Sequence, residues 1–194
     1  MSLIGEIHLP GDKSISHRAL MFTALGDGVS RLENLNPGID VKTTREALIN
    51  CGIGIEEKHG VINVQGGGLR PFSQPDHALY CGNSGTTARL MMGLLAAHPL
   101  HVQLTGDQSL SQRPMNRVFR PLQQMGANMS ARDRKFLPVM LSGRDLWALD
   151  YRLPYASAQV KSAILLAGLH AKGETTVKSP AFSRDHTEQM LKAM

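Results

Sequence analysis

The chain has 194 residues, of which 42% are hydrophobic, and it carries a formal net charge of +5. A chain of this length can bury a substantial core and corresponds to one domain or slightly more. Its basic residues are scattered rather than interleaved with aromatic side chains, which argues against a nucleic-acid-binding protein and favours a small anionic ligand. The longest apolar run, residues 90–97, is too short to span a bilayer, so we expect no membrane partner.

The cysteines and histidines indicate neither a disulfide framework nor a metal site. Cys51 and Cys81 are the two cysteines, and such a pair is typical of a reduced, cytoplasmic protein. Among the eight histidines, His98 and His101 lie close together, but no further ligand follows at a spacing that zinc sites use. We therefore expect a cytoplasmic protein without a bound metal.

Three segments of the chain open in the same way, with a short polar turn that leads into an apolar helical run. In chain order these openings are residues 11–18, 82–89 and 155–161. A hydroxyl or amide side chain before such a run is typical of a helix start. A second helix follows the first two openings and ends in the pattern Leu-x-x-x-Gly, at residues 48–52 and 122–126. Strand-like stretches come next, at residues 60–64 and 137–141.

The spacing of these features predicts an internal repeat. Arg18, Arg89 and Lys161 are separated by 71 and then 72 residues, whereas the alternative is a chance recurrence of common Gly/Leu patterns. We predict an α/β (α+β) lobe over residues 1–194, with βαβαββ repeats at about 9–75, 76–150 and 151–194 and helices on mixed sheets. The third repeat is expected to be incomplete, because a glycine and a strand pair would follow residue 194.

The repeated helix starts are candidate anion sites, because a helix N-terminus presents unpaired N–H groups and partial positive charge. Arg18, Arg89 and Lys161 are placed within the first turn of their helices, where a cation opposes the helix dipole. An anion in a shared cleft would explain them, and surface ion pairs are the alternative. Lys13, just before the first helix, is either a bridge between two anions or a solvated lysine.

Two further segments place an arginine near a helix start. Arg113 precedes Pro114, and proline is favoured at the first helical position, so a helix is expected to begin there. Arg184 is followed by Asp185 and His186 in the comparable place of the third repeat. Either arginine is suited to a bidentate grip on a carboxylate or phosphate. For the second segment the alternative is a capped helix start, with Asp185 or Thr187 as the capping side chain.

Several of these segments resemble signatures of the EPSP synthases (3-phosphoshikimate 1-carboxyvinyltransferases). Residues 9–19 (LPGDKSISHRA) resemble the N-terminal signature, residues 82–89 (GNSGTTAR) the GN-x-GT-x-x-R motif, and residues 112–115 (QRPM) the Arg-Pro loop. Residues 156–163 and 183–188 resemble the class II branch of the family. The resemblance covers nearly the whole chain, and it implies one lobe of a two-lobed enolpyruvyl-transferase fold.

The resemblance also implies roles for individual residues. The residues expected to bind shikimate 3-phosphate are Lys13, Ser14, Arg18, Ser157, Ala158, Gln159 and Arg184. The residues expected to line the phosphoenolpyruvate site are Gly85 and Arg113, with Lys13 and Gln159 near both ligands. A small residue at position 85 leaves room for the herbicide glyphosate in this family, so the parent enzyme is expected to be sensitive to it.

The implied reaction transfers the enolpyruvyl group of phosphoenolpyruvate to the 5-hydroxyl of shikimate 3-phosphate, without a metal or organic cofactor. No segment matches the family's acid–base carboxylate and lysine, which belong to the other lobe. The chain is therefore expected to be an inactive fragment that needs a C-terminal lobe and holds no catalytic residue of its own. Two alternatives are a UDP-N-acetylglucosamine enolpyruvyl transferase, whose usual cysteine is missing from residues 106–112, and a non-enzymatic module that binds a phosphate ligand.

Overall fold

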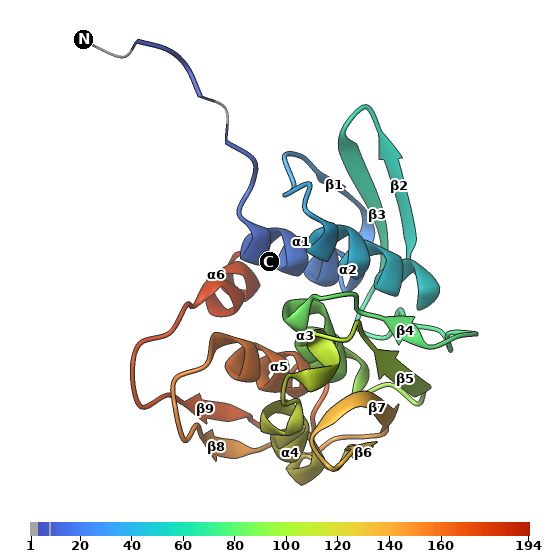
Figure 1. Cartoon of the computed structure of the whole chain (residues 1–194), viewed down its shortest axis with the longest axis vertical. Coiled ribbons are helices and arrows are strands. Elements are labelled where there is room, and N and C mark those ends of the chain that lie inside the picture. The colour runs from blue at the N-terminus through green and yellow to red at the C-terminus, as the bar shows by residue number, and fades with distance from the viewer. Residues whose placement is uncertain (1–3, 8) are drawn as a thin grey trace.

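The computed structural model describes residues 4–7 and 9–194. This part of the chain forms six α-helices, nine β-strands and one short 3-10 helix (Figure 1). In chain order they are α1 (Lys13–Ala24), β1 (Asp27–Leu32), α2 (Ile39–Asn50), β2 (Gly54–Lys58), β3 (Val61–Gly67), β4 (Leu79–Tyr80), α3 (Gly85–Leu95), β5 (His101–Thr105), η1 (Leu110–Gln112), α4 (Asn116–Gln124), β6 (Asn128–Arg132), β7 (Phe136–Ser142), β8 (Asp150–Arg152), α5 (Ala158–Gly168), β9 (Thr176–Lys178) and α6 (His186–Ala193).

The order of helices and strands confirms the α/β class. A helix, a strand, a second helix and a strand pair follow one another from α1 to β3 and again from α3 to β7, and a helix, a strand and a helix follow from α5 to α6. The exact limits of the repeats stay a prediction. A strand leads into α3 and another into α5, but residues 4–7 and 9–12 form none ahead of α1. The side chains of Ile4 and Ile7 are instead 95% and 82% exposed, because no strand pairs with this segment.

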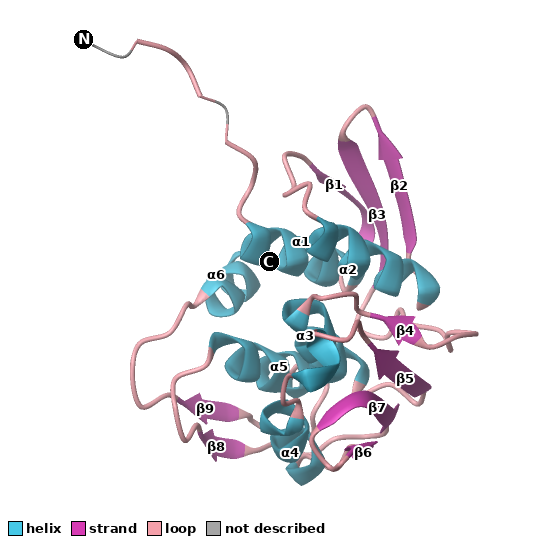
Figure 2. Cartoon of the chain, viewed as in Figure 1, coloured by secondary structure: helices cyan, strands magenta, loops and turns pink. Residues whose placement is uncertain are grey.

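The strands form three separate sheets around a centre of helices (Figure 2). The first sheet has the order β1-β3-β2 and is antiparallel throughout. The second has the order β4-β5-β7-β6, with β4 parallel to β5 and the other neighbours antiparallel. The third pairs β8 with β9 in parallel. The expectation of mixed sheets is therefore right for the second sheet and wrong for the other two.

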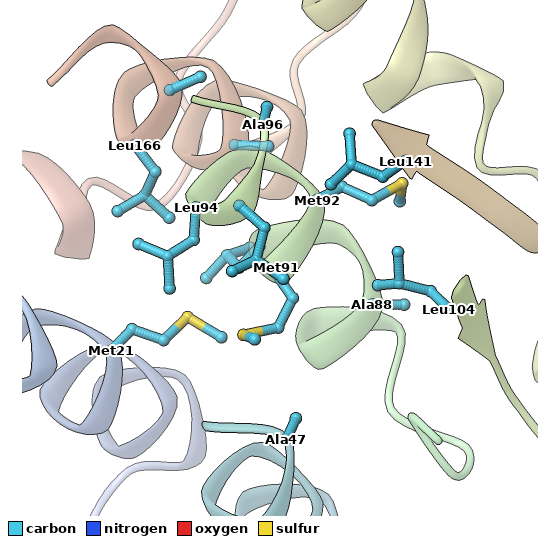
Figure 3. Packing of buried hydrophobic residues seen from close by; sticks show 14 of the residues in the cluster. Met21, Ala47, Ala88, Met91, Met92, Leu94, Ala96, Leu104, Leu141 and Leu166 are labelled. Carbon is cyan, nitrogen blue, oxygen red and sulfur yellow. The ribbon is translucent and has the colours of Figure 1, made fainter. Parts of the chain in front are cut away.

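Helix α3 forms the centre of the hydrophobic core. Every residue from Leu90 to Leu95 is buried, so this helix has no solvent-facing side along that stretch. Figure 3 shows its side chains among those of α1, α2, α5, β5 and β7. The backbones of α3 and α5 come so close that a Cβ built on Gly93 would lie 2.2 Å from the carbonyl oxygen of Ala163. A residue without a side chain is required at this crossing.

Side-chain caps fix the first residues of α1, α3 and α5. Asp12 accepts a hydrogen bond from the backbone N–H of Ile15 at 2.8 Å, and Ser84 and Ser157 cap α3 and α5 in the same way. The cap of α1 is thus an aspartate, and Ser14 lies one residue inside the helix. Arg18 falls in the second turn of α1 rather than the first, because the helix already begins at Lys13. Within the described residues, no helix is both long and apolar enough to cross a membrane.

Candidate functional site

The starts of α1, α3 and α5 meet the segment before α6 at a small open pocket. Helix α6 lies beside α1 although the two stand at opposite ends of the chain (Figure 1). The residues that line the pocket are Ser14, Arg18, Thr86, Ala158, Gln159, Arg184 and His186. Five of the nine residues expected from the sequence are therefore brought together in one place.

Arg18 stands at the inner wall of this pocket and is only 4% exposed. Its Nε donates to the hydroxyl of Thr187 on α6 at 2.7 Å, and its Nη2 donates to the hydroxyl of Ser162 on α5 at 2.7 Å. Its Nη1 donates to the backbone carbonyl of Ser14 at 2.9 Å. One guanidinium thus joins α1, α5 and α6 through neutral oxygen atoms.

The charge of Arg18 is left without a carboxylate partner in the part of the chain that the structure describes. Burial lowers the pKa of Arg18, and the nearby Arg184 lowers it further, while Glu188 acts in the opposite sense. The Nη1 of Arg184 donates to the hydroxyl of Ser14 at 3.1 Å, which brings a second guanidinium to the same pocket. A buried cation next to a second cation is electrostatically unfavourable until an anion binds between them.

A second desolvated arginine lies between α3 and α5. The Nη1 of Arg89 donates to the Oε1 of Gln159 at 2.9 Å, and its Nη2 donates to the carbonyl of Pro114 at 3.2 Å. The amide nitrogen of Gln159 in turn donates to the hydroxyl of Thr86 at 3.0 Å. Burial lowers the pKa of Arg89, and the charges of Arg113 and Arg117 lower it further. This guanidinium also bonds only to neutral oxygens among the described residues.

Arg113 lies next to this cluster, in the loop between η1 and α4. Its Nη2 donates to the hydroxyl of Ser109 at 3.1 Å, and its guanidinium also bonds to the side-chain and backbone oxygens of Asn83. The expected helix start at Pro114 is wrong, because α4 begins two residues later at Asn116 and Arg113 instead ends η1. The loop is held by Asp107, whose pKa is lowered by the backbone N–H of Leu110 and by the side chain of Asn83.

Gly85 is the first residue of α3 and lies between the two guanidinium groups. A Cβ built on Gly85 would lie 2.5 Å from the Nη1 of Arg89 and 3.8 Å from the Nη1 of Arg113. The absence of a side chain therefore keeps open the space in which both arginines present their N–H groups. A residue without a side chain lets the Arg89 guanidinium lie this close to the backbone.

Lys13 and Ser157 stand at the edge of the site. The Nζ of Lys13 lies 2.9 Å from the Oδ2 of Asp40 on α2, and the lysine side chain is 53% exposed. Lys13 does not line the pocket of Arg18 and Arg184 in this structure. The hydroxyl of Ser157 accepts from the backbone N–H of Val160 at 3.4 Å as the cap of α5, which presents Ala158 to the pocket.

The three cations at repeat spacing have different environments. The Nζ of Lys161 lies 2.5 Å from the Oε1 of Glu188, so this residue does form an ion pair, but the pair is largely buried rather than on the surface. For Arg18 and Arg89 no ion pair is found within residues 4–7 and 9–194. The sequence spacing therefore identifies structurally related positions without indicating which of them are neutralised.

The capping interpretation of α6 is wrong in its detail. Asp185 occupies the position before the helix, but its side chain makes no bond to a backbone N–H of the first turn. It accepts instead from the side-chain amide of Gln189 at 3.0 Å. Thr187 does not cap the helix either, because its hydroxyl lies 2.7 Å from the Nε of Arg18 and 2.6 Å from the hydroxyl of Ser162.

Ser162, Thr187, Thr86 and Arg89 complete the site, and the sequence analysis assigned no ligand role to the first three. All three stand in segments that the sequence marks, at residues 82–89, 156–163 and 183–188, but their partners lie up to 169 residues away along the chain, so the sequence does not indicate the contacts. Arg89 had a signal, because its spacing matches that of Arg18. His98, one half of the histidine pair considered for a metal, packs edge-on against Phe72 with ring centroids 4.8 Å apart.

The arrangement offers hydrogen-bond donors and positive charge, and no carboxylate lines the pocket among the described residues. Guanidinium, hydroxyl and amide groups bind phosphate and carboxylate groups well. Apart from the imidazole of His186, the groups that line the pocket supply no acid or base for proton transfer to a substrate. The chemistry that these residues support is the binding and orientation of an anionic ligand.

Comparisons with known proteins identify the family. The family model for EPSP synthase (3-phosphoshikimate 1-carboxyvinyltransferase) matches residues 1–194. The 3-phosphoshikimate 1-carboxyvinyltransferases of Bacillus velezensis and Bacillus subtilis are 50% and 48% identical to the chain over 193 residues, which is 99% of this chain and 45% of theirs. A solved EPSP synthase structure from Acinetobacter baumannii matches with a TM-score of 0.94 at 45% identity, covering 97% of this chain and 43% of that one.

The chain thus spans less than half the length of the curated relatives that it matches. The matching family model covers all 194 residues. The sequence identity between the chain and each of these relatives is far above the level at which a shared fold is in doubt. The chain belongs to the EPSP synthase family.

Proposed function

We propose that this chain forms the shikimate 3-phosphate-binding lobe of an enzyme that transfers the enolpyruvyl group of phosphoenolpyruvate to the 5-hydroxyl of shikimate 3-phosphate. In this reaction the 5-hydroxyl attacks C2 of the enol while C3 gains a proton, and the tetrahedral intermediate then loses phosphate. The relatives are more than twice as long as the chain. The groups that move these protons are proposed to lie in the portion of the relatives that has no counterpart in these 194 residues.

The observation that carries this proposal is the pair of arginines at the start of α1 and before α6. Arg18 is buried without a carboxylate partner among the described residues, and Arg184 bonds to Ser14 in the same pocket. The 3-phosphate group would bind between the two guanidinium groups and the Ser14 hydroxyl. Because the phosphate would compensate a charge that the protein leaves buried, this contact would contribute strongly to affinity.

The remaining roles follow from the neighbouring cluster. Ser157, Ala158 and Gln159 would contact the shikimate ring from the start of α5. Gly85, Arg113 and Gln159 would face phosphoenolpyruvate, because Gly85 leaves the guanidinium groups of Arg89 and Arg113 accessible to a carboxylate. Lys13 would contact both ligands only after its ion pair with Asp40 is broken.

Calorimetric titration of the 194-residue chain with shikimate 3-phosphate tests the proposal. We expect measurable binding of shikimate 3-phosphate and at least tenfold weaker binding of shikimate, which lacks the phosphate. The substitution Arg184→Gln should weaken the binding of shikimate 3-phosphate and leave the binding of shikimate unchanged. Arg144→Gln is the matched control, since Arg144 is an exposed arginine that does not line the pocket. Folded protein that gives no heat with shikimate 3-phosphate would contradict the proposal.

A non-enzymatic module that binds a phosphate ligand remains the second candidate, because the binding groups alone are present in these residues. Mixing the chain with the missing part of a close relative distinguishes the two. Recovery of phosphate release from phosphoenolpyruvate supports the enzyme lobe, whereas binding without recovered turnover supports the module. We also propose a cytoplasmic location, supported by the two free, buried cysteines, whose pKa burial raises to about 12.

A further inference from the structure

A separate basic groove lies on the flank of the molecule formed by α4, the turn between β6 and β7, and β8. It encloses a cavity of about 370 Å³, which is within the range of small-molecule sites. Three cations line it, namely Arg117, Arg120 and Lys135, and two tyrosines, Tyr151 and Tyr155, complete the wall. In Figure 1, α4 lies between the β6–β7 hairpin and the β8–β9 pair.

The three cations are held near one another by the fold. Arg117 and Arg120 are three residues apart on α4 and therefore lie on the same face of the helix. Lys135 is brought to the start of that helix because its carbonyl accepts from the backbone N–H of Met115 at 2.7 Å. The guanidinium of Arg117 lies 4.6 Å from the ring centroid of Tyr155, which orients it along the wall of the groove.

No acidic residue lines this groove among the residues that the structure describes, and none of its three cations makes an ion pair there. Some other exposed cations of the described chain find a carboxylate, as Lys172 does with Asp145 at 2.9 Å, and others, such as Arg144, do not, so the distinguishing feature of the groove is that three cations line one cavity. Three cations of like charge around one cavity repel one another unless an anion lies between them.

We propose that this groove binds a small compound that carries a diphosphate group, at a site separate from the pocket of Arg18 and Arg184. Two guanidinium groups and one ammonium group match the charge and the spread-out oxygens of a diphosphate better than those of a single carboxylate. Tyrosine hydroxyls supply neutral donors beside them. The proposal stands on the groove itself and does not require the activity proposed above.

The groove adjoins the candidate site through Pro114. Pro114 lines the groove, and its carbonyl accepts from the Nη2 of Arg89 at 3.2 Å. A ligand that moves the start of α4 would therefore move a partner of Arg89. Because the two sites are neighbours, the test must report on each of them separately.

The test is a titration of the isotopically labelled 194-residue chain with inorganic pyrophosphate, followed by NMR. The backbone amides of Arg117, Lys135 and Tyr155 report on the groove, and those of Ser14 and Gln159 report on the candidate site. We expect saturable shifts in the groove, with orthophosphate binding there at least tenfold more weakly than pyrophosphate. Shifts that grow linearly without saturation, or equal affinity for the two anions, would overturn the proposal.

The double variant Arg117→Gln and Arg120→Gln should lower the affinity of the groove for pyrophosphate by about tenfold or more, because two charge-assisted contacts are removed. It should leave the titration of the Ser14 and Gln159 amides unchanged. Both arginines are exposed, so the variant is expected to fold, and a thermal melt checks this. Arg144→Gln is the control. If it weakens pyrophosphate binding as much as the double variant does, pyrophosphate is attracted by the net charge of the protein alone, and the proposed site is rejected.

Discussion

The Nη1 of Arg89 donates to the Oε1 of Gln159 at 2.9 Å, and this bond joins the start of α3 to the start of α5. The two residues lie 70 positions apart, and each belongs to one of the predicted helix openings. The partner of this half-buried guanidinium is a neutral amide rather than a carboxylate. The site therefore keeps its positive charge available for a ligand.

Gln159→Glu tests this interpretation directly. A carboxylate at the same place would pair with Arg89 and compensate its half-buried charge, while Thr86 could donate its hydroxyl hydrogen to the new side chain. We expect a higher melting temperature together with at least tenfold weaker binding of phosphoenolpyruvate or another small carboxylate, measured by differential scanning fluorimetry and calorimetry. Tighter anion binding by this variant would show that Arg89 does not serve as an anion site.

The ion pair of Lys161 and Glu188 is predicted to stabilise the fold rather than bind ligand. Its two side chains are 11% and 30% exposed. Lys161→Met and Glu188→Gln should each lower the free energy of unfolding by about 1–3 kcal/mol, since each leaves a poorly solvated partner uncompensated. The double variant should lose less unfolding free energy than the sum of the two single losses, as measured by urea denaturation. Strictly additive losses would mean that the pair contributes no coupling energy.

We predict from the buried environment of His17 that the protein loses stability in mild acid. It is fully buried, its Nδ1 lies 2.6 Å from the hydroxyl of Thr44, and burial lowers its pKa from 6.5 to about 4. Between these values the unfolded chain binds a proton at this residue that the folded chain does not, so stability falls as the pH drops from 6.5 to 4. The full effect of His17 is about 3 kcal/mol.

His17→Gln is the variant that isolates this effect, because the amide can still bond to Thr44 and does not titrate. Its unfolding free energy should depend less on pH between 4 and 6.5 than that of the unaltered chain. Burial also lowers the pKa of His170 to about 4, so His170→Gln serves as a second, independent variant. An unchanged slope in His17→Gln would exclude His17 as a source of acid sensitivity.

Gly93→Ala is predicted to destabilise the core. The new Cβ would lie 2.2 Å from the carbonyl oxygen and 2.7 Å from the Cα of Ala163, and neither backbone atom can turn away. Separating α3 from α5 should cost about 3 kcal/mol in urea denaturation. Gly26→Ala is the control, because the nearest atom to its Cβ is the Thr23 oxygen at an ordinary 3.4 Å. Equal losses in the two variants would contradict the close helix crossing.

Local sequence patterns predict the helices and strands well where one residue decides the outcome. Gly52 and Gly126, the glycines of the Leu-x-x-x-Gly pattern, adopt positive φ values of 89° and 111° directly after α2 and α4. A left-handed residue at a helix end favours glycine strongly, so the sequence carries that information locally. The start of α4 was missed because Pro114 resembles a first helical residue but follows a 3-10 turn instead.

The pocket is only partly predictable from the sequence, because its contacts depend on tertiary packing rather than on a local residue. Ser162 and Thr187 stand in recognisable segments, as Arg184 does, but only the packing of α5 and α6 against α1 shows that their hydroxyl groups bond to Arg18. Whether a cation is neutralised is likewise decided by tertiary contacts. Lys161 has a glutamate one helix away, and Arg18 at the related position has hydroxyl groups.

The bond between Arg18 and Thr187 has a consequence for how the protein is made. Its two residues lie 169 positions apart, on α1 and α6. During synthesis, the segment that carries Arg18 leaves the ribosome long before Thr187 exists. The nascent chain can therefore bury most of its core first, and this pocket is completed only when α6 emerges.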